Sequence, residues 1–113
     1  VIGPHWRMDL ERQVPGSVEQ VRRDAHTFFD ADLPALLAWQ FTARDAHRVT
    51  CPVMQVGGTD SGPWFAEVRT LMLSWFPDAE DVVVQGPDHS LGITHTEQVA
   101  AAILSFLRRN RMS

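Results

Sequence analysis

Residues 52–63 read PVMQVGGTDSGP, and this stretch decides the fold. The apolar run at 53–56 is typical of a short buried strand, and the glycines after it turn the chain into the helix-like segment 64–75. Enzymes with parallel sheets commonly carry functional side chains where a strand turns into a helix. The stretch therefore predicts an α/β architecture and makes Asp60, at the centre of the turn, a candidate functional residue.

The rest of the C-terminal part, residues 49–113, continues the same alternation. A helical stripe over 64–75 ends at Pro77, and the run DVVVQG at 81–86 predicts a second strand. A last helix begins at THTE, with Thr94 as N-cap and Glu97 as its capping-box partner, and is expected to bury Val99, Ile103 and Phe106. Because a strand, a crossover helix and a second strand normally pair in parallel, these residues predict a parallel βαβα unit.

The N-terminal part, residues 1–48, gives no strand signal and predicts a helical region. Ser17 is expected to cap one helix, with Gln20 as capping-box partner. Asp32 is expected to begin a second helix, with Pro34 in its first turn. The chain therefore divides into a helical region at 1–48 and a βαβα region at 49–113.

Two strands are too few for a stable sheet of their own. An isolated pair is marginal in water, and both outer edges would be open to other chains. We therefore expect residues 49–113 to be the terminal part of a larger sheet that other residues complete.

Composition limits the classes of partner. The 113 residues include 14 acidic and 10 basic side chains, without a basic stripe that would attract nucleic acid. Cys51 is the single cysteine, so an intrachain disulfide is impossible and a reducing, cytoplasmic setting is favoured. No apolar run approaches the length of a membrane span, so a membrane is not expected as a partner. The charge balance argues in the same way against nucleic acid.

Two segments together resemble a known family. The stretch RVTCPVMQVGGTDSG at 48–62 and the stretch FPDAEDVVVQGPDHSLGITHTEQVAAAILSFLRR at 76–109 resemble the C-terminal part of an α/β-hydrolase of the esterase, lipase and haloperoxidase group. FFDADLPALLAWQF at 28–41 is similar to the cap helices of some members. The resemblance implies that Asp60 is the catalytic acid and His89 the catalytic histidine, with a small-molecule ester or similar carbonyl compound as substrate.

The sequence departs from the family in two respects. It contains neither a G-x-S-x-G nucleophile elbow nor a glycine-rich oxyanion segment. The resemblance therefore implies the C-terminal portion of a hydrolase, which works with an N-terminal half or else forms a homo-oligomer, and it implies no cofactor. Trp39 and Phe41 could line an acyl pocket under a cap, or pack the cap onto the sheet, and packing is favoured.

The chemistry of these two residue types suits the implied roles. A histidine has a pKa near neutrality, so His89 could take a proton from a nucleophile and return it to the leaving group. A carboxylate bonded to the other ring nitrogen fixes the tautomer and stabilises the imidazolium, which is the role expected of Asp60.

Four other interpretations stay open at this stage. GGTDSGP can be a plain turn, and His89 a plain loop histidine. The pattern G-x-D-x-G at 58–62 resembles the elbow of hydrolases with an aspartate nucleophile, but here only one strand follows it before the histidine. The histidines show no metal-ligand spacing, so a metal site is not expected. The chain could also be a non-catalytic, hydrolase-like module that assembles through its exposed sheet edge.

Overall fold

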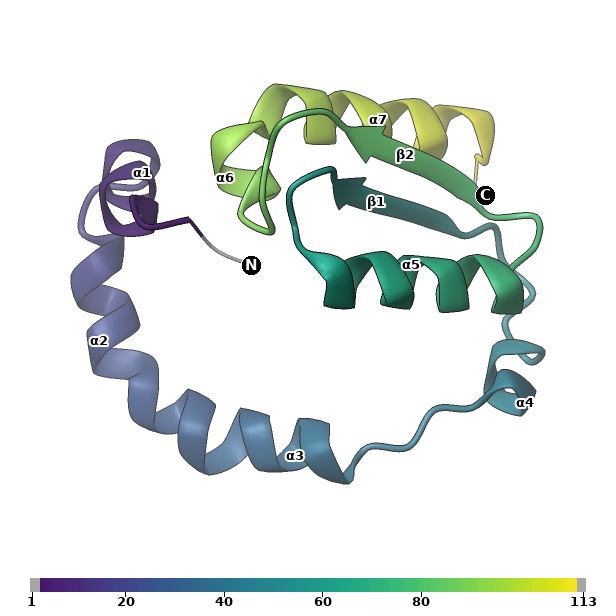
Figure 1. Ribbon diagram of the computed structural model, residues 1–113, viewed down its shortest axis with the longest axis horizontal. Helices are drawn as coiled ribbons and strands as arrows, with labels where there is room; N and C mark the ends of the chain where they lie inside the picture. The colour runs from purple at the N-terminus through teal and green to yellow at the C-terminus, as the bar shows by residue number, and fades with distance from the viewer. Residues whose placement is uncertain (1–2, 112–113) are drawn as a thin grey trace.

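The computed structural model describes residues 3–111, in which seven α-helices, one π-helical turn and two strands follow one another (Figure 1). The N-terminal half holds α1 (Trp6–Gln13), α2 (Ser17–Thr27), η1 (Phe28–Asp32), α3 (Leu33–Ala38) and α4 (Ala43–Ala46). The C-terminal half holds β1 (Met54–Gly58), α5 (Pro63–Trp75), β2 (Glu80–Val84), α6 (Leu91–Thr94) and α7 (Thr96–Arg109).

The two strands form one parallel sheet. Met54 of β1 lies opposite Glu80 of β2, and the register continues to Gly58 opposite Val84. This confirms the predicted mixed helix-and-strand chain with parallel pairing. The expected strand at 53–56 runs on through both glycines, because their backbones pair with Val83 and Val84.

Two helices flank the strands, α5 on one side and α7 on the other (Figure 1). The side chains of consecutive strand residues point to opposite faces of the sheet, as those of Glu80 and Asp81 do at the start of β2. Asp81 accepts a hydrogen bond from Arg69 Nε of α5 at 2.9 Å, while Glu80 pairs with Arg109 of α7. The hydrogen bond from Arg69 holds the pKa of Asp81 below its usual value. The two ion pairs therefore tie one helix to each face of β2.

The N-terminal helices form an arm that curves away from the sheet (Figure 1). We call residues 6–38, from α1 to α3, the helical arm. The prediction of two separate helices in this region was wrong, because α2, η1 and α3 run on without a break. Asp32 has helical angles of φ −69° and ψ −48°, so it does not act as an N-cap. The N–H of Leu33 bonds to the carbonyl of Phe28, a π-type step just before Pro34, which has no N–H to donate.

The capping box expected at Ser17 is absent from the structure. Gly16, at a positive φ of 84°, occupies the N-cap position of α2. The carboxylate of Glu11 instead accepts hydrogen bonds from the N–H groups of Gly16 and Val18, at 2.6 and 3.2 Å. A carboxylate from the end of the preceding helix has therefore replaced the Ser17 cap that the sequence pattern suggested.

The capping box expected at Thr94 is also wrong. A short helix, α6, ends at this residue, and the Thr94 hydroxyl donates to the carbonyl of Ser90 at 3.4 Å. His95 then precedes α7 without a side-chain cap. A capping box does form at the start of α4, where the Asp45 carboxylate accepts hydrogen bonds from the N–H and the hydroxyl of Thr42, both at 2.9 Å. Aspartate here takes the place of the glutamate or glutamine of the usual pattern.

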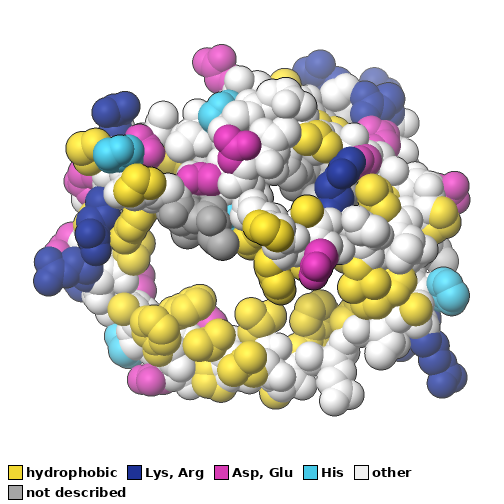
Figure 2. Space-filling model, in the orientation of Figure 1, with side chains coloured by type: hydrophobic (Ala, Val, Ile, Leu, Met, Phe, Trp, Pro, Cys, Tyr) yellow, Lys and Arg dark blue, Asp and Glu magenta, His cyan; other side chains and the backbone are white. Residues whose placement is uncertain are grey.

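The core is sparse for a chain of this length. Among the described residues, Ala46 and Val84 are the buried aliphatic side chains, at 2% and 7% exposure. The surface area is 8663 Å², whereas a compact monomer of this size exposes about 6,200 Å². The radius of gyration is 16.1 Å, against about 13 Å for a compact domain. Figure 2 shows the reason: open space separates the stretch from α2 to α3 from the βαβα region.

Several side chains expected in the core are consequently exposed. Trp64 and Leu71 of α5 and Ile103 of α7 carry the apolar stripes of their helices, yet each is more than 40% exposed. The expectation that Ile103 is buried was therefore wrong, whereas Val99 and Phe106 are half-buried. The described helices include none that is both long enough and apolar enough to cross a bilayer.

Candidate active site

The loops that follow the two strands meet at the carboxyl edge of the sheet. The backbone N–H of Asp60 donates to the carbonyl of Pro87 at 3.0 Å, and the N–H of Thr59 donates to the carbonyl of Val84 at 3.1 Å. The hydroxyl of Thr59 accepts from the N–H of Gly86 at 2.8 Å. Three hydrogen bonds therefore fasten the loop of Asp60 to the loop that leads to His89.

This approach depends on a glycine at the end of β1. A Cβ added at Gly58 would lie 2.4 Å from the carbonyl oxygen of Pro87 and 2.9 Å from that of Asp88. Both neighbours are backbone atoms, so a larger residue would push the loops apart. Gly58 is thus required by the contact between the loops, a role that the sequence pattern attributed only to the turn.

The side chains of Asp60 and His89 are both exposed, and the described residues show no hydrogen bond between them. The imidazole of His89 instead stacks on the ring of Phe65 in α5, with centroids 3.7 Å apart and planes inclined by 15°. The structure brings the two loops together but turns the histidine toward α5. The hydrogen bond from His89 to Asp60 stays a prediction.

Asp88 has a structural role that the sequence interpretation missed. One carboxylate oxygen accepts hydrogen bonds from the hydroxyl and the N–H of Ser90, and the other accepts from the N–H of Gly3. These bonds, the Ser90 hydroxyl first among them, hold the pKa of Asp88 below its usual value. Asp88 therefore braces the His89 loop and fastens it to Gly3, just before the helical arm. An aspartate two residues before a serine is a known turn pattern and could have revealed this.

A cavity of about 450 Å³ lies beside the two loops. Residues of β1, its exit turn and α5 make most of the wall, together with Val83 and His89. Ser61 belongs to this wall; it is 5% exposed, and its hydroxyl has no hydrogen-bond partner among the described residues. From the sequence, Ser61 can be considered as a nucleophile, but Asp60 is better placed to act with the histidine, so Ser61 was not predicted as a site residue.

The other predicted site residues lie elsewhere. The rings of Trp39 and Phe41 are 5.4 Å apart, and Phe41 contacts Trp75, at the last residue of α5, with a centroid distance of 5.7 Å. His89 contacts Phe65, in the first turn of the same helix. The structure therefore does not bring Trp39 and Phe41 together with Asp60 and His89, and a role in substrate binding stays a prediction.

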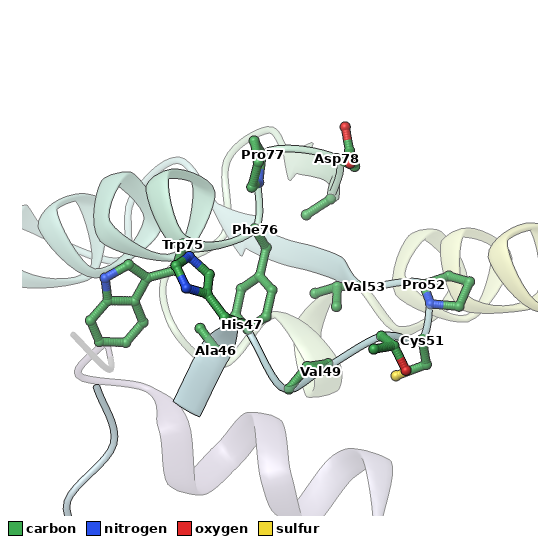
Figure 3. A pocket seen from close by; sticks show the side chains of 12 residues that line it. Ala46, His47, Val49, Cys51, Pro52, Val53, Trp75, Phe76, Pro77 and Asp78 are labelled. Atoms are coloured by element: carbon green, nitrogen blue, oxygen red, sulfur yellow. The ribbon is translucent and has the colours of Figure 1, made fainter. Parts of the chain in front are cut away.

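A second cavity, of about 480 Å³, lies at the far end of the sheet from the two loops (Figure 3). Its wall includes Val53, just before β1, and Trp75 and Phe76 at the end of α5. Cys51 also lines it and is exposed. Because functional side chains of parallel sheets collect at the carboxyl ends of strands, this amino-end cavity is separate from the candidate active site.

Neither a metal centre nor a relative helps to identify the site. Residues 3–111 contain no group of three histidine, cysteine, aspartate or glutamate side chains placed to hold a metal ion. Comparisons with protein-family models, with curated proteins and with solved structures found no match to this chain. The functional assignment therefore rests on the residues and their geometry.

Proposed function

We propose that this chain supplies the catalytic acid and the catalytic histidine of a serine-type α/β-hydrolase that acts on an ester or a similar carbonyl compound. The nucleophile then comes from outside residues 1–113. One observation carries the proposal: the exit loops of two parallel strands, one bearing Asp60 and the other His89, are hydrogen-bonded side by side at the carboxyl edge.

In this role His89 removes the proton from the serine hydroxyl and gives it to the leaving group. Asp60 positions the imidazole and stabilises its protonated form. Because both side chains are exposed, His89 can turn away from Phe65 and toward Asp60 without disturbing buried side chains. Catalytic hydrogen bonds often tighten only when the site is fully assembled and substrate is bound.

The unpaired edge of β1 favours a sheet that a further strand, from outside residues 3–111, completes. The carbonyl of Val53 and the N–H of Thr59 both bond toward β2. Since backbone groups alternate along a strand, those of Met54 and Val56 point to the other edge, where no strand pairs in the described chain. An unpaired strand edge next to exposed apolar helices is suited to pairing with a further strand.

Ester hydrolysis with burst kinetics tests the proposal. The chain alone should give no burst with p-nitrophenyl acetate, because it lacks the nucleophile and the oxyanion segment. The complete hydrolase should give a burst that a serine-directed phosphonate abolishes, with the label on a serine outside residues 1–113. A burst from the chain alone, with phosphonate bound to Ser61, would overturn the proposal.

A second candidate is a non-catalytic interaction module that assembles through the sheet edge. The exposed apolar surface and the stacking of His89 on Phe65 favour it. The two candidates differ in one measurable respect. A module would assemble with its partner and show no turnover with any ester, and His89→Ala would change neither property.

A further inference from the structure

The inference concerns the ring of Phe65, on which the imidazole of His89 lies. The centroids of the two rings are 3.7 Å apart and their planes are inclined by 15°, so the rings are stacked face to face. Phe65 is half-buried in the first turn of α5, and the indole of Trp64 meets it edge-on at a centroid distance of 4.7 Å. Phe65 therefore offers a surface, held by its own helix, to a histidine from another loop.

The backbone on both sides of His89 is held by hydrogen bonds, whereas its side chain is exposed. The carbonyl of Pro87 accepts from the N–H of Asp60 at 3.0 Å, and the carboxylate of Asp88 accepts from the N–H of Ser90 at 2.8 Å. The imidazole can change direction by rotation about its own side-chain bonds, without movement of the loop. Two orientations of one side chain therefore suffice to make or break a contact with Asp60.

The two orientations respond differently to solvent. Stacking of two aromatic rings favours their contact by a factor of about three to ten, and it does not require a closed site. A hydrogen bond from His89 to the carboxylate of Asp60 gains little while both groups are exposed, because water competes for both. The same bond becomes stronger where further protein excludes water. The stack is therefore favoured in the chain alone, and the hydrogen bond is favoured in an enclosed site.

We propose that Phe65 is a positioning residue that holds His89 away from Asp60 until further protein covers the two loops. This rests on the proposed function, because the two groups that the stack keeps apart are the proposed catalytic acid and histidine. In the assembled site the imidazole leaves Phe65, and its two nitrogens face Asp60 and the nucleophile. His89 thus acquires its catalytic partners only on assembly.

The test is NMR of the full chain, isotopically labelled in its histidines. Phe65→Leu removes the aromatic face but keeps an apolar side chain, so the ring protons of His89 should lose the upfield shift that a stacked aromatic ring causes. Phe65→Tyr restores an aromatic face and should restore the shift. Phe29→Leu is the matched control, because Phe29 lies in the arm and packs on Phe28, and it should leave the His89 signals unchanged.

A second measurement follows the released ring to Asp60. At a pH where the imidazole is neutral, the ratio of the Nδ1–H tautomer to the Nε2–H tautomer of His89 should rise about threefold in Phe65→Leu, since a carboxylate that accepts from Nδ1–H selects that tautomer. Nitrogen chemical shifts of the imidazole report this ratio. Asp60→Ala, added to Phe65→Leu, should return it to the wild-type value.

The wild-type chain gives a check that holds even if the Phe65 variants do not fold. The ring protons of His89 should lie upfield of those of His26, an exposed histidine of the arm. Equal shifts for the two histidines, unchanged His89 signals in folded Phe65→Leu, or a tautomer ratio that does not respond to Phe65→Leu would each overturn the proposal. None of these measurements uses turnover, so their failure leaves the hydrolase proposal to be decided by the kinetics of His89→Ala.

Discussion

The βαβα region and the helical arm have similar apolar patterns in sequence but pack very differently. In the βαβα region, residues far apart in the chain are joined by a parallel ladder, two ion pairs and the hydrogen bonds between the loops. In the arm, Phe29 and Leu37 are exposed, Leu37 at 78%. An apolar stripe therefore predicts a helix reliably but does not supply the surface on which that helix packs.

The two regions meet at few points. Asp88 accepts a hydrogen bond from the N–H of Gly3, just before the arm, and Phe41, just after it, contacts Trp75 of α5. The first helix of the arm, α1, also lies against α6, and the stretch from α2 to α3 then curves across open space (Figure 2). We infer that the exposed apolar side chains of the arm pack on a surface that residues 3–111 do not supply.

The largest expected effect is on turnover, and it distinguishes a histidine of the βαβα region from one in the helical arm. If the chain belongs to the proposed hydrolase, His89→Ala should lower the turnover of the complete enzyme by at least about 10⁴-fold, because the proposed proton acceptor is lost. His26→Ala is the matched control in the arm, where the ring bonds to the carbonyl of Arg23 and to the hydroxyl of Thr27, far from the two loops. Steady-state kinetics with a p-nitrophenyl ester give both values. Equal activity in the two variants would show that His89 has no catalytic role.

Asp60→Asn should lower turnover by about 10⁴-fold while leaving substrate binding unchanged, because an amide can hold the wrong imidazole tautomer. Asp78→Asn is the matched control, since Asp78 is an exposed carboxylate between α5 and β2, away from the two loops. The informative measurement is the split between kcat and KM. A change confined to KM would show that Asp60 contributes to binding and does not position His89.

Much of the βαβα region could be predicted, because strand runs, Pro77 and the crossover rule act over short stretches of chain. The arm was predicted less well, since its continuity depends on a π-type step that the sequence pattern does not encode. The cap of α2 was missed because Glu11 acts from six residues before Ser17. The stacking of His89 on Phe65 is a tertiary contact without a local signal.

Gly58→Ala should destabilise the βαβα region by about 1–3 kcal/mol, because the new Cβ would clash with backbone oxygens of the neighbouring loop. Gly92→Ala is the matched control: a Cβ there meets nothing within 4 Å, and the residue lies within helix α6. Urea unfolding of the full chain measures both. A neutral Gly58→Ala would show that the two loops are not held as closely as described.

Val84→Ala should cost about 2 kcal/mol, since it removes two buried methyl groups and leaves a cavity. Leu37→Ala, in the arm, should change the free energy of unfolding by less than about 0.5 kcal/mol, because its side chain is already exposed. The same urea experiment compares them. If Leu37→Ala is as costly as Val84→Ala, the arm is packed and the contrast between the regions fails.

The smallest expected effect concerns the hydrogen bonds that Asp88 accepts from Gly3 and Ser90. Its pKa is lowered in the folded chain, so the unfolded chain binds the proton more readily. The contribution to stability is complete above the unfolded pKa of about 3.9 and is lost as the pH falls through the lower folded value. Wild type should therefore lose more stability than Asp88→Asn between about pH 5 and pH 2. Parallel curves of stability against pH for the two chains would contradict this.

We infer that further protein covers the exposed apolar surface and pairs with the open edge of β1. Sedimentation of the full chain at micromolar concentration is combined with hydrogen exchange at Met54 and Val56 and with binding of a hydrophobic dye. We expect the chain to self-associate, or as a monomer to bind the dye and exchange these amides rapidly. A compact monomer that binds no dye and fully protects both amides would contradict the account.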